Sequence, residues 1–563
     1  MNKKYLLPIL LTLVCFACKK KDPVHPTNGN GNTPADSTNT QHISVLTQHN
    51  DNNRAGLNDH ETALTPANVN SAHFGKLFEL SVDDQTYAQP LVVGNLTIGN
   101  KTRNVVFIAT VNNTVYAYDA DSGTLFWQKN YTQSGMRTPN HTDMSSSWCT
   151  PYNDISYNIG IIGTPVIDPT SQTIYFVARS TDGTHFVQHL HAVNIATGEE
   201  QAGSPVKIEA SVPGTGDGSV NGVVSFDPLR NNQRQGLALV NGTVYISYAS
   251  HCDWNPYHGW IFGYDAKSLA QTVVYNDTPS GENGGIWESG MGIAADAQGN
   301  LYVTTGNGTV GQGNLFIKTG NGTDENNPNP DPTDLSNRSE SALKLTPSGN
   351  TLQVSSYFTP TNYLDLNIND LDYGVMGTFL IPNSNLFVTG CKDGNIYLLD
   401  KDNMGGYSTV ANQVVQTIPI NNSMHCQPAF FQGAGNAYVY FWSENDRLRA
   451  YSFNNGKFAF TPTTSSLPGP GGGTGAILSV SSNGTSNGIL WAWYASSGDA
   501  AGQSSPGILR AFDAANITKE LWNSGQSAND FPGFYAKFCA PTIANGKVFL
   551  GTFSHKVIVY GLK

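Results

Sequence analysis

The segment "CAPTIANGKVFLGTFSHKVIVYGLK", Cys539–Lys563, contains three short apolar runs separated by polar joints. The runs are rich in β-branched and aromatic residues, which favour β-strands. Asn-Gly and similar polar pairs between such runs are typical of tight turns. The segment therefore predicts a small unit of three consecutive strands.

The same kind of unit recurs along the whole chain. Its first strand appears as "AQPLVVGN", "GTPVIDPT", "GLALVNGT", "GIAADAQG", "GTFLIPNS", "CQPAFFQG", "AILSVSSNG" and "CAPTIANG". Each is followed by a second apolar strand and then by a third, mostly with a turn behind it. Radial repetition of such units is typical of a β-propeller. The repeats predict an all-β, eight-bladed propeller over residues 42–563, in which "KLFELSV", residues 76–82, supplies the missing outer strand of the last blade and closes the ring.

The composition agrees with many short strands joined by turns. The 563 residues include 58 Gly and 29 Pro, and only 13% are charged. The formal net charge of -12 would repel a phosphate backbone. We therefore expect no nucleic acid among the partners.

The N-terminus "MNKKYLLPILLTLVCFAC" has a basic start and an apolar run too short to span a bilayer. It predicts a signal peptide over residues 1–17 and resembles a bacterial lipoprotein leader, which implies lipidation of Cys18. Cys15 stands where such leaders usually carry leucine, so an ordinary secretory leader cut elsewhere is the alternative. With Cys18, the polar residues up to 41 are expected to form a lipid anchor and flexible tether. Membrane lipid is then a partner, and the chain is held outside the cytoplasm in a bacterial cell envelope.

Five cysteines follow the leader: Cys149, Cys252, Cys391, Cys426 and Cys539. An odd number in an oxidising compartment leaves at least one free thiol. Whether Cys149 pairs with Cys252 stays open. His258, and His425 next to Cys426, lack the spacing of a structural zinc site, which favours packed strand residues over metal ligands.

A family resemblance rests on particular motifs. The turn "DADSGTLFW", residues 119–127, resembles the tryptophan-bearing motif by which blades of the pyrroloquinoline quinone (PQQ) dehydrogenases dock on their neighbours. The resemblance extends from about Gln85 to the C-terminus. Within it, "GGIWESGMGIAADAQGNLYVTTGNGT", residues 284–309, is similar to a segment of the quinoprotein alcohol dehydrogenases. That similarity implies that Trp287 forms the floor under a quinone and that Asn307 ligates calcium.

Three further residues take candidate roles through the same resemblance. "NDLDYG" places Asp372 where these enzymes carry their catalytic base, and Asp372 is also a candidate metal ligand. "CKDGNIYLLD" places Lys392 where a cation contacts the quinone carbonyls. Asp253 in "YASHCDWNPYHGW" is the carboxylate nearest to the family's calcium-binding glutamate. Calcium prefers such carboxylate and amide oxygens, and a carboxylate can accept the proton of an alcohol.

The chain also departs from the family. No two cysteines are adjacent, so the usual disulfide ring over the quinone is missing, and no CxxCH sequence would attach a haem. A binding or assembly scaffold without turnover is therefore the favoured function. The alternative is a calcium- and PQQ-dependent alcohol or sugar dehydrogenase. Each candidate residue also has a plain structural interpretation, as an apolar anchor, turn residue or solvated strand end, so the dehydrogenase hypothesis requires all five to converge at one end of the propeller channel.

Overall fold

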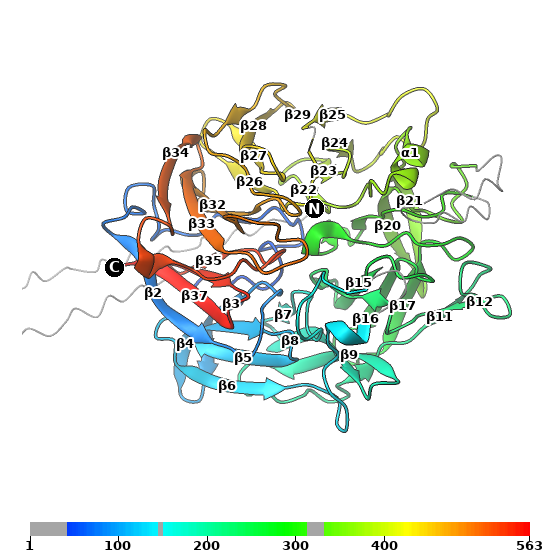
Figure 1. The fold of residues 1–563 in the computed structure, drawn as a ribbon, viewed down its shortest axis with the longest axis horizontal. Helices are drawn as coiled ribbons and strands as arrows, with labels where there is room; N and C mark the ends of the chain where they lie inside the picture. The colour runs from blue at the N-terminus through cyan, green and yellow to red at the C-terminus, as the bar shows by residue number, and fades with distance from the viewer. Residues whose placement is uncertain (1–41, 145–149, 312–330, 421) are drawn as a thin grey trace, which may run out of the picture. The chain divides into compact units, whose positions relative to one another are not determined.

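Apart from one two-stranded hairpin, the strands form eight small sheets arranged around one centre, as the computed structural model shows (Figure 1). The structure describes residues 42–144, 150–311, 331–420 and 422–563. The prediction of an all-β, eight-bladed propeller is confirmed. Cys18 and the leader and tether predicted over residues 1–41 lie outside the described residues.

The first four blades pair their strands antiparallel. Blades 1, 2 and 4 run in chain order, whereas in blade 3 the first two strands both pair with the third. Blade 1 contains β3 (Leu91–Ile98), β4 (Lys101–Ala109), β5 (Thr114–Asp119) and β6 (Leu125–Asn130). Blade 2 contains β7 (Val166–Asp168), β8 (Thr173–Thr181), β9 (Phe186–Asn194) and β10 (Val206–Lys207). Blade 3 contains β13 (Asn231–Asn232), β14 (Ala238–Val240), β15 (Thr243–Ser250), β16 (Trp260–Asp265) and β17 (Gln271–Asn276). Blade 4 contains β18 (Ala294–Ala295), β19 (Leu301–Thr304), β20 (Ala342–Ser348) and β21 (Thr351–Phe358).

The second half repeats this arrangement. Blade 5 contains β22 (Phe379–Leu380), β23 (Leu386–Gly390), β24 (Asn395–Asp400) and β25 (Gln416–Pro419). Blade 6 contains β26 (Ala429–Gln432), β27 (Ala437–Phe441), β28 (Arg449–Asn454), β29 (Lys457–Phe458) and β30 (Thr463–Thr464). Blade 7 contains β31 (Ile477–Asn483), β32 (Ser486–Ala495), β33 (Gly507–Asp513) and β34 (Asn516–Asn523), with β1 (Leu57–Asn58) parallel to β31. Blade 8 contains β35 (Thr542–Ala544), β36 (Lys547–Gly551), β37 (Lys556–Leu562) and β2 (Phe74–Ser81).

A few short elements lie between the blades. They are the hairpin of β11 (Ser211–Pro213) and β12 (Val223–Ser225), the helix α1 (Tyr363–Ile368), and the 3-10 turns η1 (His141–Met144), η2 (Glu288–Gly290) and η3 (Ala528–Asp530).

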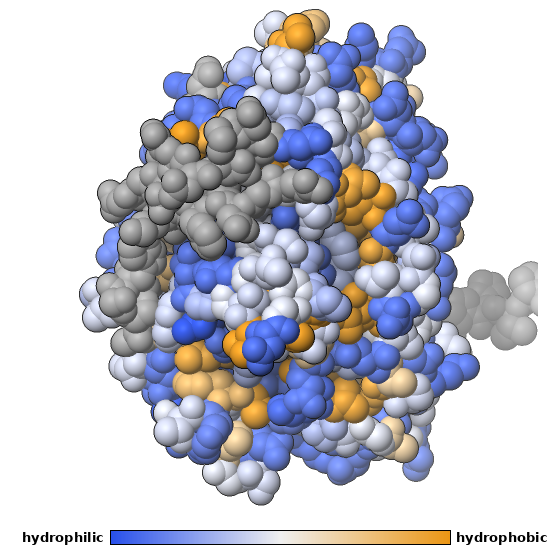
Figure 2. All heavy atoms as spheres, turned by 90° about the vertical axis from the view of Figure 1, so that its right-hand side faces the viewer, coloured by the Kyte–Doolittle hydropathy of each residue, from blue (hydrophilic) through white to orange (hydrophobic). Residues whose placement is uncertain are grey.

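The middle strands of the blades are buried on both faces. Every residue of β5 and of β8 is buried, whereas the outer strand β6 is mostly exposed or half-buried. A blade packs against two neighbours, so its central strands read as continuous apolar runs rather than as alternating ones. On the outside, the face in Figure 2 carries polar side chains with small groups of apolar ones between them.

Trp127 shows how one blade docks on the next. Its indole Nε1 donates a hydrogen bond of 3.0 Å to the Ile195 carbonyl oxygen in blade 2. A Cβ on Gly198 would come within 2.8 Å of the same ring, so the close approach requires glycine there. This contact is the one expected of the motif at residues 119–127.

Strand β2 pairs antiparallel with β37, and so joins the N-terminal part of the propeller to its last blade. Leu80 lies opposite Val557 and is buried, whereas Phe78 lies opposite Val559 and is half-buried. Residues far apart in the chain therefore share one sheet.

A second N-terminal element, residues 45–58, was not predicted from the sequence. We call it the inner segment, because it makes hydrogen bonds at the innermost strand of every blade. Its partners, in blade order, are Val92, Ile167, Leu239, Ala295, Leu380, Phe430, Val480 and Ile543. Arg54, fully buried in this segment, donates to the carbonyl oxygens of Gln48, Leu237 and Ile293 at 2.8 to 3.2 Å. The inner segment thus links all eight blades, to blades 3 and 8 through the side-chain amides of Asn52 and Asn58 and to the other six through backbone groups.

No helix in the part of the chain that the structure describes is both long enough and apolar enough to cross a membrane.

Candidate functional site

A cavity of about 250 Å³ opens near the centre of the ring. Residues from all eight blades line it, mainly from loops that lead into the innermost strands. They are Tyr87, Tyr152, Asp154, Ile155, Ile162, Asn232, Arg234, Ser250, Cys252, Asp253, Trp287, Asp372, Val375, Lys392, His425, Gly473, Thr474, Ala501, Lys537 and Phe538. A cavity shared by so many loops on a rigid scaffold is the usual form of a small-molecule site.

The cavity is separated from the inner segment by Gln427. Its Nε2 donates to the carbonyl oxygens of Ser289 at 2.7 Å and Phe538 at 2.9 Å, which lie next to cavity residues. Its Oε1 accepts from Gln48 Nε2 of the inner segment at 3.2 Å. Gln427, Gln48 and the two carbonyl groups therefore form a buried, hydrogen-bonded polar layer between the cavity and the inner segment.

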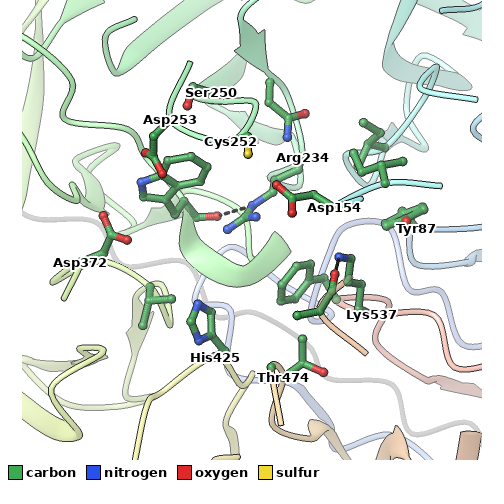
Figure 3. A pocket seen from close by; sticks show the side chains of 18 of the residues that line it. Tyr87, Asp154, Arg234, Ser250, Cys252, Asp253, Asp372, His425, Thr474 and Lys537 are labelled. Carbon is green, nitrogen blue, oxygen red and sulfur yellow. Dashed lines mark hydrogen bonds between the residues drawn. The ribbon is translucent and has the colours of Figure 1, made fainter. Parts of the chain in front are cut away.

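The predicted site residues meet at one end of this cavity. Asp253, Trp287, Asp372 and Lys392 all line it. Asn307 is fully buried beside them: its backbone N–H donates to Asp372 Oδ1 at 2.9 Å, and its Nδ2 donates to Asp370 Oδ1 at 2.6 Å. We call the group Asp253, Asn307, Asp370, Asp372 and Lys392 the acidic end (Figure 3 shows Asp253 and Asp372).

Charge pairing holds the acidic end together. Lys392 Nζ lies 2.6 Å from Asp372 Oδ2 and 3.3 Å from Asp370 Oδ1. Burial alone would lower the pKa of Lys392, but the Asp372 and Asp370 carboxylates outweigh burial and raise it. Burial, followed by the charges of Asp372 and Asp370, raises the pKa of Asp253 to about 7. The Tyr257 hydroxyl donates to Asp253 Oδ1 at 2.7 Å and opposes that shift.

The oxygens of this end suit a hard cation in one respect. Asn307 Oδ1 is buried without a hydrogen-bond partner among the described residues. Its amide nitrogen lies 2.6 Å from Asp370 Oδ1, so the amide oxygen lies within about 5 Å of that carboxylate oxygen. One calcium ion could contact both, because each oxygen would sit about 2.4 Å from it. In the described part of the chain, however, no group of three His, Cys, Asp or Glu side chains is arranged to hold a metal.

Trp287 forms one wall of the cavity and is 9% exposed. The guanidinium carbon of Arg234 lies 5.1 Å from its ring centroid, and Arg234 Nε donates to the Trp287 carbonyl oxygen at 3.0 Å. The Trp287 Nε1–H is buried without a partner in the described residues. The tryptophan is therefore an accessible flat wall that an arginine already partly covers.

Sequence reasoning missed several residues of the site. Arg234, Lys537 and Asp154 line the cavity, and Asp370 binds both Asn307 and Lys392. For Asp370 a signal existed, since it lies two positions before Asp372 in "NDLDYG". Arg234 in "NNQRQG" and Lys537 in "FYAKFC" carry no motif that points to a site.

The cysteines and histidines divide as follows. Cys391, Cys426 and Cys539 are free and buried, as the odd count required of at least one thiol. Cys252 lines the cavity and is disulfide-bonded, while Cys149 lies outside the described residues. His258 is buried between Thr278 and the Asp217 carbonyl oxygen. His425 lines the cavity and contacts Ser423 at 2.9 Å.

Comparison with known proteins concerns the fold. No protein-family model matches the sequence, and no curated protein matches it. Among solved structures, a europium-containing methanol dehydrogenase is 12% identical with a TM-score of 0.59, over 92% of this chain and 98% of that chain. The quinohemoprotein alcohol dehydrogenase ADHIIG from Pseudomonas putida HK5 is 13% identical with a TM-score of 0.55, over 93% and 81%. That of Comamonas testosteroni is 14% identical with a TM-score of 0.51, over 94% and 81%. The chain thus has the propeller fold of the quinoprotein alcohol dehydrogenases.

Proposed function

We propose that the chain is a lipid-anchored, extracytoplasmic propeller that binds a small organic ligand in the central cavity without turning it over. The observation that carries this proposal is the convergence of charged and aromatic side chains from all eight blades on one cavity. Both oxygens of Asp372, the predicted base, are engaged, by Asn307 and by Lys392. A carboxylate held in this way is a binding group rather than a free proton acceptor.

A calcium- and PQQ-dependent dehydrogenase is the second candidate. The unpartnered Asn307 Oδ1 and the meeting of five predicted residues favour it. Asn307, Asp370 and Asp253 would hold the cation, Trp287 would face the quinone, and Lys392 would donate to its carbonyl oxygens. A bound quinone supplies the capacity to accept a hydride. Asp372 would accept the proton of the alcohol. This step requires Lys392 to release its ion pair with Asp372 Oδ2.

One titration separates the two candidates. Purified protein is mixed with PQQ, with and without calcium chloride, and quinone absorbance is measured after removal of free PQQ. An alcohol and an artificial electron acceptor are then added. Uptake that depends on calcium, followed by alcohol oxidation, would establish the dehydrogenase, and uptake without oxidation would support the binding propeller.

Variants test the assignment of the residues. Asn307→Ala should abolish calcium-dependent uptake, whereas Asp372→Asn should keep uptake and lose any oxidation. Asn529→Ala, at an exposed asparagine, is the matched control and should change neither. Equal uptake by Asn307→Ala and the control would reject a cation site at Asn307.

The anchoring proposal has its own experiment. The short apolar leader that ends in Ala17 and Cys18 supports lipidation of Cys18. We expect Cys18→Ser to release the protein from the membrane fraction of the cell. Unchanged fractionation of this variant would reject the lipid anchor.

A further inference from the structure

Two cations that line the cavity, Arg234 and Lys537, form no direct ion pair with a carboxylate among the described residues. Arg234 precedes β14 and Lys537 precedes β35, so they come from blades 3 and 8. In Figure 3 Lys537 lies on the side of the cavity opposite Asp253 and Asp372, and Arg234 and Asp154 lie between the two sides. We call Arg234 and Lys537 the basic end.

The hydrogen bonds of the basic end go to backbone carbonyls. Arg234 Nε donates to the Trp287 carbonyl oxygen, and Lys537 Nζ donates to that of Ala501. The charge of Asp154, at the exposed rim, acts on both cations without a direct ion pair. Asp372 and Asp253 act on Arg234 in the same way, and Asp499 acts on Lys537. Lys537 is 7% exposed. The remaining N–H groups of the guanidinium and ammonium are therefore available to a ligand.

Aromatic rings fix the position of the guanidinium. Its carbon lies 5.1 Å from the Trp287 ring centroid and 5.0 Å from that of Phe538. Such contacts orient the planar fork of an arginine, which matches the two oxygens of a carboxylate. The donors are thus arranged in advance for a planar anion.

The arrangement is electrostatically unfavourable without an anion. Burial lowers the pKa of Lys537 to about 8; Asp154 opposes the shift, and the positive charge of Arg234 adds to it. Burial likewise lowers the pKa of Arg234, and the charges of Asp154, Asp372 and Asp253 oppose that shift without cancelling it. Buried charges in proteins are normally paired, and a negative group between these two would restore that balance.

We propose that Arg234 and Lys537 form an anion subsite that binds the carboxylate of a small aromatic acid. The aromatic walls, Tyr87, Tyr152, Trp287 and Phe538, favour an aromatic body. A single carboxylate suits the site better than a phosphate dianion, because Asp154 at the rim and the carboxylates of the acidic end repel a second negative charge. This assignment rests on the proposed binding function and names its ligand class.

Calorimetric titration with benzoate and benzyl alcohol tests the subsite, since the two probes differ mainly in the carboxylate. We expect benzoate to bind at least tenfold more tightly. Arg234→Gln and Lys537→Met should each weaken benzoate binding about tenfold and leave benzyl alcohol unchanged. The benzoate affinity of Arg234→Lys should lie between those of wild type and Arg234→Gln, because lysine keeps the positive charge and lacks the planar guanidinium. Lys457→Met, at an exposed lysine, is the matched control, and circular dichroism verifies folding of every variant.

The outcomes distinguish the subsite from the cavity. Equal binding of benzoate and benzyl alcohol would overturn the anion subsite and leave cavity binding intact. No binding of either probe would count against both proposals. Benzoate affinity unchanged in Arg234→Gln and Lys537→Met would place binding elsewhere. Inorganic phosphate that binds as tightly as benzoate, and is weakened by the same variants, would overturn the aromatic carboxylate assignment.

Discussion

The two ends of the cavity handle buried charge in opposite ways. At the acidic end Lys392 bridges Asp370 and Asp372, and Asn307 binds both aspartates. At the basic end, of the residues described, only backbone carbonyls contact the Arg234 and Lys537 donors. The charge of Lys392 is therefore paired within the protein, whereas the charges of Arg234 and Lys537 are paired by the proposed ligand. The same fold thus combines a structural ion-pair cluster with a binding site in one cavity.

The largest expected effect is the difference in stability between two variants, each of which lacks the lysine of one end. Lys392→Met should destabilise the fold by about 3 kcal/mol, because it leaves two carboxylates partly buried without their counter-ion. Lys537→Met should be neutral or stabilising, because it removes an unpaired buried ammonium and keeps its apolar stem. Urea unfolding of the two variants and wild type measures both effects. A greater loss of stability in Lys537→Met would contradict the difference between the ends.

A second expectation concerns pH. At the acidic end the folded pKa of Asp253 is raised to about 7. The folded state then binds more protons than the unfolded state, so this contribution to stability is present below about pH 4 and lost as the pH rises to about 7. Asp253→Asn should flatten the decline. Unfolding midpoints are measured from pH 4 to 7. An equal fall in wild type and Asp253→Asn would reject a contribution of Asp253 to the decline.

Lys537 should make stability rise with pH, the opposite of Asp253, and at a higher pH. Its folded pKa is lowered from 10.5 to about 8, so the unfolded state binds more protons between these values. The penalty for its charge is present below about pH 8, and stability rises as the pH increases towards 10.5. Lys537→Met should remove that rise. The same measurement between pH 8 and 10 checks it, with Lys457→Met as the control.

The smallest expected effect is a change in benzoate affinity when the charge of Asp154, at the rim of the basic end, is removed. Asp154 is exposed and lowers the local positive potential at Arg234 and Lys537. Asp154→Asn should strengthen benzoate binding by about twofold at low salt. High salt should abolish the gain, because exposed charges are screened. A weaker affinity in Asp154→Asn would show that this carboxylate belongs to the subsite itself.

The sequence predicted the fold better than the site. The blades were recognisable because each central strand is buried on both faces and must be an apolar run, as in β8. Four residues of the acidic end were predicted from motifs that resemble those of the quinoprotein alcohol dehydrogenases, namely Asp253, Asn307, Asp372 and Lys392, whereas Asp370 was missed. Arg234 and Lys537 could not be predicted, because only closure of the ring brings blades 3 and 8 to one cavity.

The inner segment escaped prediction for another reason. Its contacts to the blades use mainly backbone N–H and carbonyl groups, which almost every residue carries, so "VLTQHNDNNRAGLN" shows no apolar periodicity. Asn52, Arg54 and Asn58 also contact the blades through their side chains, and a fully buried arginine surrounded by carbonyl oxygens is the most specific of these features. A single arginine in a polar stretch nevertheless gives no signal before the fold is known.

The inner segment also has a consequence for the order of events during folding. Its residues are among the first of the propeller to be synthesised, yet its partners extend from Val92 to Ile543. Contacts so distant in the chain form late, because the entropy of closing long loops opposes them. Complete docking of this segment requires an innermost strand from every blade. It therefore acts as a check on assembly: a chain that lacks its last blade cannot complete the docking of its first residues.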